Sequence, residues 1–219
     1  MKTINKLALL MLLCISGFSI HAQSDNWIGR VNYLNSPGGF VLGYTNSQFR
    51  YHSSEGSTYG SYKGRDNFLH GGYAGFVFEI NCFRGLGFYL GSIVEYSYDP
   101  NGTYQTSEGE YTDYKEFRLY FPLHLHLKLP LNEHNAIGLH SGVGFTPVVY
   151  SAFTDSKGYL KALDAYGEYG MAKTNITFDW GVYYQIRKVR ISAAWRYGIA
   201  NLKDIVYGNE FCAGLDFMF

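Results

Sequence analysis

Two histidines stand two positions apart in this chain, at His124 and His126. In an extended segment alternate side chains point to the same face, so the two imidazoles could approach one metal ion together. A zinc site in a protein uses at least three protein ligands, and the spacing of the sequence identifies no third one. The pattern alone is weak evidence, and we predict no metal site and no cofactor.

Serine and histidine form a second chemical combination, because many hydrolases pair a serine nucleophile with a histidine base. Ser92 and Ser141 fall on the apolar phase of their segments, whereas the histidines of the expected strands are assigned to the opposite phase. A nucleophile and its base must share a face to form a hydrogen bond. We therefore predict no catalytic residues and no enzymatic activity.

Ionisable side chains recur on the more polar phase of several extended segments. Such a set could line a polar path or a binding site, or its members could pair with one another to fill a closed interior. The predicted members are Glu79, Glu95, Glu116, Arg118, His124, His126, Lys128, Asp179, Arg190, Arg196 and Asp216, and His140 and Glu210 share their phase. The choice between these interpretations depends on the elements that position the side chains.

The segment around which the chain is organised is Phe117–Leu129, FRLYFPLHLHLKL, with a large apolar residue at every odd position. A strict period of two is typical of a β-strand with one apolar face. At about 3.3 Å per residue the segment spans about 40 Å, which favours a membrane over a small globular core. We therefore predict these lipid-facing residues, including two from later segments: Phe117, Leu119, Phe121, Leu123, Leu125, Leu127, Trp180 and Trp195.

The same alternation predicts eight strands, and the connections between them alternate between long and short. The expected strands are Gly39–Arg50, His70–Asn81, Leu86–Tyr98, Tyr114–Leu129, Ala136–Val149, Lys173–Ile186, Val189–Ile199 and Asn209–Phe219. The expected long loops are Tyr51–Leu69, Asp99–Asp113, Ser151–Gly170 and Ala200–Gly208. This asymmetry is typical of outer-membrane barrels, with short periplasmic turns and longer external loops. The fold class is therefore an all-β, eight-stranded antiparallel transmembrane up-and-down β-barrel, with a local bulge expected at Pro122.

The N-terminus indicates secretion. Lys2 and Lys6 precede an apolar run from Leu7 to Phe18, and Ala22 provides a small residue for cleavage, so we expect a signal peptide over residues 1–22. Residues 23–38 are the expected periplasmic lead-in and residues 39–219 the barrel domain. We expect no disulfide between the two cysteines of the mature chain, Cys82 and Cys212, because Cys82 lies at a turn and Cys212 lies within the last strand, which is not adjacent to it in the sheet.

Composition agrees with a barrel. The chain contains 21 Tyr and 16 Phe, and aromatic rings of this kind are enriched at the two membrane interfaces. Its formal net charge is zero, which gives no basic field for nucleic acid. An eight-stranded barrel leaves room inside for side chains and little for water, so paired charges are the favoured interpretation of the interior and a diffusion porin is not expected.

Several segments resemble outer-membrane β-barrel proteins of the Bacteroidota, in the PorT-like and OmpA-barrel-like families. The resemblance is carried by Phe121–Leu125, Gly142–Pro147, Asp179–Val182 and Arg196–Leu202. It implies a cell outer-membrane location and a shared fold, and it implies no catalytic residues. Leu215–Phe219 looks like the C-terminal signal read by the barrel assembly machinery, with Phe217 and Phe219 as its aromatic residues. A peptidoglycan-binding domain after the barrel, which many OmpA-like proteins carry, is not expected.

We therefore expect an integral outer-membrane barrel with a structural, surface-exposed or envelope-assembly role. Its expected partners are outer-membrane lipid, the barrel assembly machinery and an envelope or surface partner of unknown identity that binds the external loops. The alternative is a secreted lipocalin-like carrier of a small apolar ligand, because eight alternating strands with the apolar phase turned inward would give the same periodicity.

Overall fold

The computed structural model describes residues 38–51, 68–83, 85–106, 109–155, 160–161, 174–199 and 205–219. Within them the long strands are β1 (Gly38–Tyr51), β2 (Phe68–Phe83), β3 (Leu86–Thr106), β4 (Gly109–Pro130), β5 (Asn135–Asp155), β7 (Thr174–Ile186), β8 (Val189–Gly198) and β9 (Ile205–Met218). A two-residue strand, β6 (Leu160–Lys161), pairs only with the far end of β5. The expected signal peptide and nearly all of the lead-in lie outside the described residues.

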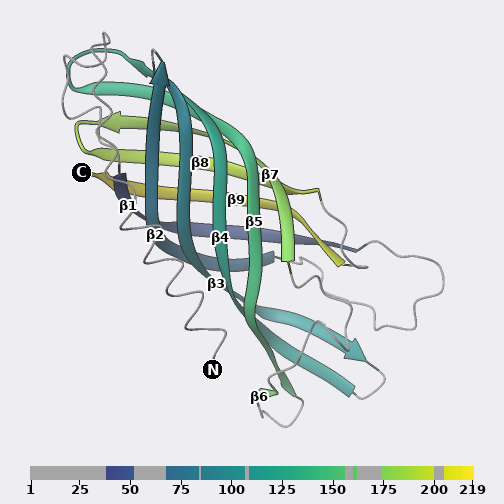
Figure 1. The fold of residues 1–219 in the computed structure, drawn as a ribbon. Helices are drawn as coiled ribbons and strands as arrows, with labels where there is room; N and C mark the ends of the chain where they lie inside the picture. The colour runs from purple at the N-terminus through teal and green to yellow at the C-terminus, as the bar shows by residue number, and fades with distance from the viewer. Residues whose placement is uncertain are drawn as a thin grey trace, which may run out of the picture.

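The eight long strands close into a barrel (Figure 1). Each strand pairs antiparallel with the next long strand along the chain, and β1 pairs antiparallel with β9 to complete the ring. Closure leaves no open edge along the wall of the barrel. The predicted eight-stranded antiparallel up-and-down barrel is therefore confirmed. None of the described residues forms a helix long and apolar enough to cross a membrane.

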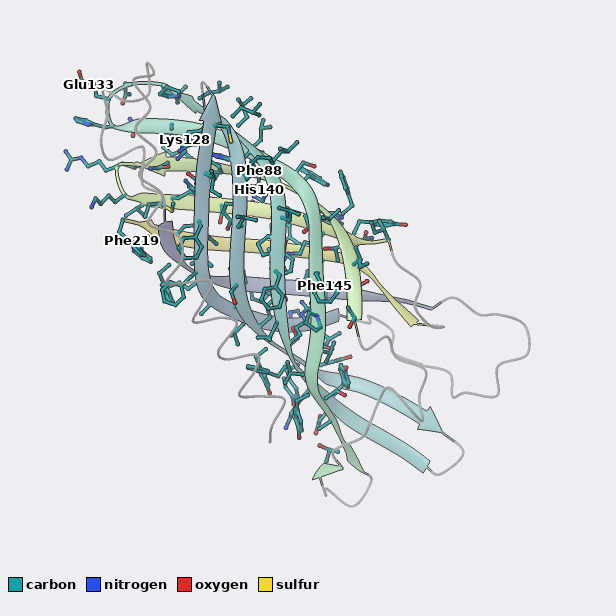
Figure 2. All side chains as sticks on the ribbon, in the orientation of Figure 1. Phe88, Lys128, Glu133, His140, Phe145 and Phe219 are labelled. Atoms are coloured by element: carbon teal, nitrogen blue, oxygen red, sulfur yellow. The ribbon has the colours of Figure 1, made fainter. Side chains whose placement is uncertain are left out.

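The barrel is apolar outside and charged inside. Leu123 and Leu125 of β4 are 52% and 55% exposed, whereas the side chains that alternate with them, His124 and His126, are 2% and 1% exposed. The same inversion holds for residues labelled in Figure 2, where Phe88 and Phe145 belong to the outer face and Lys128 and His140 to the inner one. Charged side chains are the residue class least often buried in water-soluble proteins, so this barrel is inverted relative to them.

Four strands extend at least four residues beyond their expected bounds at one end. Asp99–Asp113, expected as a loop, is instead mostly strand, because β3 continues to Thr106 and β4 begins at Gly109. This part of the hairpin pairs through Thr103–Thr112 and Tyr104–Tyr111, and Thr and Tyr favour strands without needing an apolar face. Likewise β5 reaches Asp155, inside the expected loop Ser151–Gly170, and β9 begins at Ile205, inside Ala200–Gly208.

The bulge expected at Pro122 is also absent. Pro122 pairs with Gly144 of β5 in unbroken register, and β3 keeps one register on both sides of it. A Cβ on Gly91 of β3 would stand 3.1 Å from the proline ring, so a glycine opposite Pro122 provides space for the ring. The register of β4 against β5 shifts at Phe117 and Arg118 instead.

That shift changes the environment of one predicted lipid-facing residue. Arg118, Leu119 and Tyr120 are three consecutive buried residues, so the alternation is interrupted directly after the shift. Leu119 is 8% exposed although its partner on β3, Val94, is 40% exposed. Leu119 is therefore covered although it pairs with an outward residue, and its contact with lipid stays a prediction. The other predicted members lie on the outer face and are partly or largely exposed: Phe117, Phe121, Leu123, Leu125, Leu127, Trp180 and Trp195.

Candidate functional site

The interior of the barrel collects the ionisable residues that the sequence places on the polar phase. His140 is partly buried. The others are at most 6% exposed: Glu79, Glu95, Glu116, Arg118, His124, His126, Lys128, Asp179, Arg190, Arg196, Glu210 and Asp216. They come from β2, β3, β4, β7, β8 and β9, and the inward phase of each strand aims them at a common axis. Buried charges require partners, and the structure provides these in two clusters and a layer between them.

The first cluster lies toward the end of the barrel with the short turns and is centred on Glu79. Its carboxylate is 2.5 Å from Lys128 Nζ, 2.8 Å from Arg190 Nη1 and 3.8 Å from His126 Nδ1. Arg190 also lies 3.7 Å from an oxygen of Asp216. Two carboxylates therefore face one lysine and one arginine within this cluster.

The second cluster lies toward the opposite end and is centred on Arg118. Its guanidinium contacts three carboxylates, at 2.7 Å to Glu95, at 3.4 Å to Glu116 and through a close hydrogen bond to Glu210. Arg196 approaches Glu95 at 2.5 Å and Glu210 at 3.5 Å. Two arginines thus hold three carboxylates, and planar guanidinium groups suit this role because each can donate several hydrogen bonds in fixed directions.

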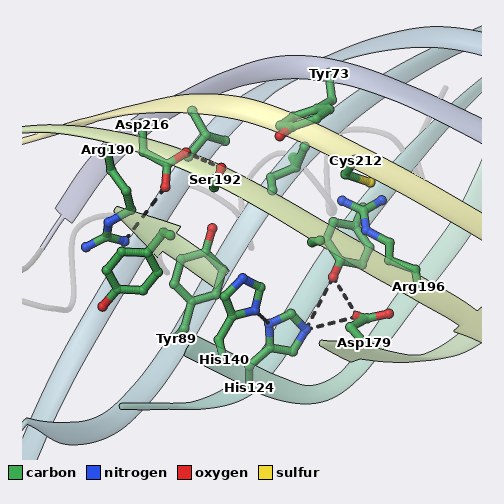
Figure 3. A pocket seen from close by; sticks show the side chains of 15 residues that line it. Tyr73, Tyr89, His124, His140, Asp179, Arg190, Ser192, Arg196, Cys212 and Asp216 are labelled. Atoms are coloured by element: carbon green, nitrogen blue, oxygen red, sulfur yellow. Dashed lines mark hydrogen bonds and ion pairs between the residues drawn. The ribbon is translucent and has the colours of Figure 1, made fainter. Parts of the chain in front are cut away.

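Histidine and tyrosine rings occupy the layer between the clusters (Figure 3). Asp179 accepts a hydrogen bond from the Tyr120 hydroxyl at 2.6 Å and lies 2.9 Å from His124 Nε2. On the other side of the ring, His124 Nδ1 is 2.9 Å from His140 Nδ1, and the two rings differ in plane by only 9°. One of the two facing nitrogens must carry a proton for this contact to be a hydrogen bond. Tyr89 stacks on both imidazoles.

This layer surrounds a small cavity of about 40 Å³. Its lining includes His124, His140, Tyr73 and Cys212, and a space of this size has room for about one to three water molecules. Arg196 lies with its guanidinium carbon 3.5 Å from the centre of the Tyr120 ring, so the layer is packed directly against the second cluster. The interior is therefore filled by side chains.

The two histidines of the His124-x-His126 pattern have different partners. His124 contacts Asp179 and His140, whereas His126 lies near Glu79 in the first cluster. Across the described ranges no group of three or more His, Cys, Asp or Glu side chains is arranged to hold a metal ion. Cys82 and Cys212 are free thiols, the first exposed and the second buried.

Tyrosines are the interior residues that sequence reasoning missed. Tyr73, Tyr89, Tyr120 and Tyr183 line the cavity, although the tyrosine content was attributed to the membrane interfaces. Their phase is the available signal, because each alternates with outward apolar residues. Facing glycines make room for them: a Cβ on Gly138 would stand 2.1 Å from the Tyr183 ring.

The histidine of β2 departs from the expected phase. His70 is exposed on the outer face, where its Nδ1 lies 2.5 Å from the Tyr44 hydroxyl. It therefore shares a face with Ser92, contrary to the prediction for strand histidines. Ser92 pairs with Phe76, six positions along β2 from His70, which is about 20 Å at strand spacing. That separation is too great for a nucleophile and its base.

Comparison with known proteins finds similar solved structures but no matching protein family. No family model matches the chain, and no curated protein matches it. Solved structures that it resembles include Ail, the attachment invasion locus protein of Yersinia pestis, at 14% identity and a TM-score of 0.40 over 84% of this chain and 99% of that one. Neisserial surface protein A, NspA, matches at 14% identity with a TM-score of 0.44, over 82% of this chain and 97% of that one.

Two further neighbours have different descriptions. The outer membrane protein OprG from Pseudomonas aeruginosa matches at 10% identity with a TM-score of 0.45, over 84% of this chain and 97% of that one. The outer membrane enzyme PagL matches at 10% identity with a TM-score of 0.42, over 82% of this chain and 99% of that one. The barrel assignment of this chain rests on its own strand pairing.

Proposed function

We propose that this protein is an integral outer-membrane β-barrel. The observation that carries the proposal is the inverted distribution of side chains, with exposed leucines and tryptophans outside and paired charges inside. Large exposed apolar surfaces mark sites of membrane or protein contact, and here the apolar face surrounds the barrel. Closed barrels satisfy every backbone hydrogen bond of the wall, which a hydrocarbon environment requires. The secretory signal expected at residues 1–22 supplies the route.

The filled interior supports a role other than diffusion. Two ion-pair clusters and an aromatic layer occupy the axis, and the cavity between them holds only a few water molecules. A lipocalin-like carrier would need its apolar phase turned inward to bind an apolar ligand. Leu139 and Ile191 are instead 51% and 55% exposed on the outside, so a carrier is not favoured.

The role we propose is structural, surface-exposed or concerned with envelope assembly, without enzymatic activity. Support comes from the part of the sheet that extends past the rest of the barrel, where the hairpin of β3 and β4 projects with β5 and β6 (Figure 1). This projection is at the end opposite the short turns, which is the external end in the proposed orientation. It offers a surface to an envelope or surface partner, while lipid contacts the wall and the barrel assembly machinery acts through Phe217 and Phe219.

Fractionation of cells tests the proposal. Membranes are washed with high salt and with carbonate, and the protein is then extracted with detergent and run on gels with and without boiling. An integral barrel stays in the washed membranes, needs detergent for release and migrates differently when boiled. Recovery of the native protein as a soluble periplasmic monomer would contradict the membrane location.

A further inference from the structure

The apolar outer face ends in one row of polar side chains at the external end. Asn46 of β1 pairs with His70 of β2, His70 pairs with Tyr98 of β3, and Tyr98 pairs with Lys115 of β4. Neighbouring strands are about 4.8 Å apart, so the row crosses the wall over about 14 Å. We call these four residues the outer row.

The outer row borders an aromatic belt. Two residues closer to the short-turn end, β1 carries Tyr44 and β3 carries Tyr96, which are 44% and 48% exposed. At the same level β4 carries Phe117. Exposed tyrosines on a barrel wall mark the level of lipid headgroups. The outer row therefore lies where headgroups meet the protein, provided that the barrel spans the membrane as proposed above.

His70 presents a hydrogen-bond donor at this level. Its Nδ1 lies 3.2 Å from the amide nitrogen of Asn46 and 2.5 Å from the hydroxyl of Tyr44. The amide nitrogen can only donate, so Nδ1 accepts and the ring proton of neutral His70 is on Nε2. Within the part of the chain that the structure describes, no side chain accepts from Nε2, so this donor can serve a group outside the protein.

Lys115 and Asp113 place opposite charges next to Tyr98. Lys115 Nζ lies 5.5 Å from the centre of the Tyr98 ring, so the lysine reaches toward β3 and is held there by a cation–π contact. The Asp113 carboxylate lies near enough to the Tyr98 hydroxyl to interact with it electrostatically. The Asp113 backbone is left-handed, with φ of 56°, a conformation that aspartate tolerates better than most residues.

We propose that the outer row and Asp113 bind a zwitterionic lipid headgroup of the phosphoethanolamine type, with one phosphate and one primary amine. The Lys115 ammonium and the His70 Nε2–H donate to the phosphate, and the amine donates to the Asp113 carboxylate. A lone basic patch would favour any anionic lipid, but a carboxylate beside the lysine favours a headgroup with both charges.

The order of the two charges along β4 agrees with the order of charges in such a lipid. Lys115 is nearer the aromatic belt, and Asp113 is two positions further along β4 toward the external end. In a phosphoethanolamine headgroup the phosphate is attached nearer the acyl chains and the amine lies beyond it. The Tyr98 side chain interacts with both charged groups.

Native mass spectrometry of the detergent-solubilised barrel measures this preference. The folded band on an unboiled gel is checked first, and the protein is then titrated with phosphatidylethanolamine, phosphatidylglycerol and phosphatidylcholine of identical acyl chains. The variants are Lys115→Gln and Asp113→Asn, and Lys188→Gln is the matched control because Lys188 is an exposed cation in the turn at the opposite end. These side chains are outside the packed interior, so the variants keep the folded band.

The proposal predicts a different pattern for each variant. Lys115→Gln weakens binding of both phosphatidylethanolamine and phosphatidylglycerol by about tenfold, the size expected for a lost hydrogen bond to a charged group. Asp113→Asn weakens phosphatidylethanolamine by a similar factor and does not weaken phosphatidylglycerol, which has no amine. Lys188→Gln changes neither.

Two results would overturn the proposal. In one, neither Lys115→Gln nor Asp113→Asn changes phosphatidylethanolamine binding by more than the Lys188→Gln control. In the other, Asp113→Asn leaves phosphatidylethanolamine binding unchanged while Lys115→Gln weakens both lipids equally, which would mean that the site takes a phosphate alone. Failure of the intact chain to remain in washed membranes would instead contradict the proposed function.

Discussion

Replacing Arg118 by methionine tests the interpretation of the barrel interior as a paired-charge core. Arg118 is 1% exposed and contacts the carboxylates of Glu95, Glu116 and Glu210. Methionine keeps much of the volume but leaves Glu95 and Glu210 with Arg196 alone of the two arginines, and it removes the guanidinium from Glu116. Removing one partner from a buried ion pair typically costs about 3–5 kcal/mol, so the free energy of unfolding should fall by about that amount.

The assay is urea-induced unfolding from lipid vesicles, followed by tryptophan fluorescence and by the folded band on unboiled gels. Arg187→Met is the matched control, because Arg187 is exposed in the turn between β7 and β8 and a surface cation contributes about 0–1 kcal/mol. The double variant Arg118→Met, Glu95→Gln should recover part of the loss, since it also removes one of the buried carboxylates. A loss below about 1 kcal/mol for Arg118→Met, equal to the control, would refute the paired-charge interpretation.

Three further predictions concern the wall, the lumen and the last strand. Leu123→Arg should reduce the free energy of unfolding from vesicles by about 2–4 kcal/mol, because it places a charge in hydrocarbon; an unchanged value, together with a severe loss for His124→Leu, would mean that the two faces are assigned the wrong way round. Pure monomer in planar bilayers should carry almost no steady current, since side chains fill the lumen; large stable channels would revive a porin function. Phe219→Ala should lower the folded, membrane-integrated fraction in cells more than it lowers refolding in detergent, as measured by heat-modifiable migration; equal effects in both assays would argue against an assembly signal.

Alternation along the strands was sufficient to predict the barrel and the face of most side chains. The period of two in Phe117–Leu129 separates Leu123 from His124 without any knowledge of tertiary contacts. It does not reveal where pairing shifts, so the burial of Leu119 beside the shift at Phe117 and Arg118 could not be predicted. Likewise, the polar residues of 99–113 did not indicate that β3 and β4 continue to Thr106 and from Gly109. The pairing there depends on the partner strand and not on an apolar face.

Contacts inside the barrel required the register of all eight strands. Arg118 and Glu210 are 92 residues apart, and only closure of β1 on β9 brings their strands near the same interior level. The hydrogen bond between His124 and His140 depends in the same way on the pairing of β4 with β5. The inward tyrosines could have been assigned by phase alone, since Tyr73 alternates with Ala74 and Phe76.

Quenching of tryptophan fluorescence by brominated lipids tests the membrane location of the wall most directly. Trp180 and Trp195 are paired neighbours on β7 and β8, 53% and 37% exposed on the outer face, and Trp27→Phe removes the remaining tryptophan of the chain. For the folded variant in vesicles, bromine on the acyl chains should quench the fluorescence strongly, and aqueous iodide should have little effect. Strong quenching by iodide with none by acyl-chain bromine would place both tryptophans in water and contradict an integral outer-membrane barrel.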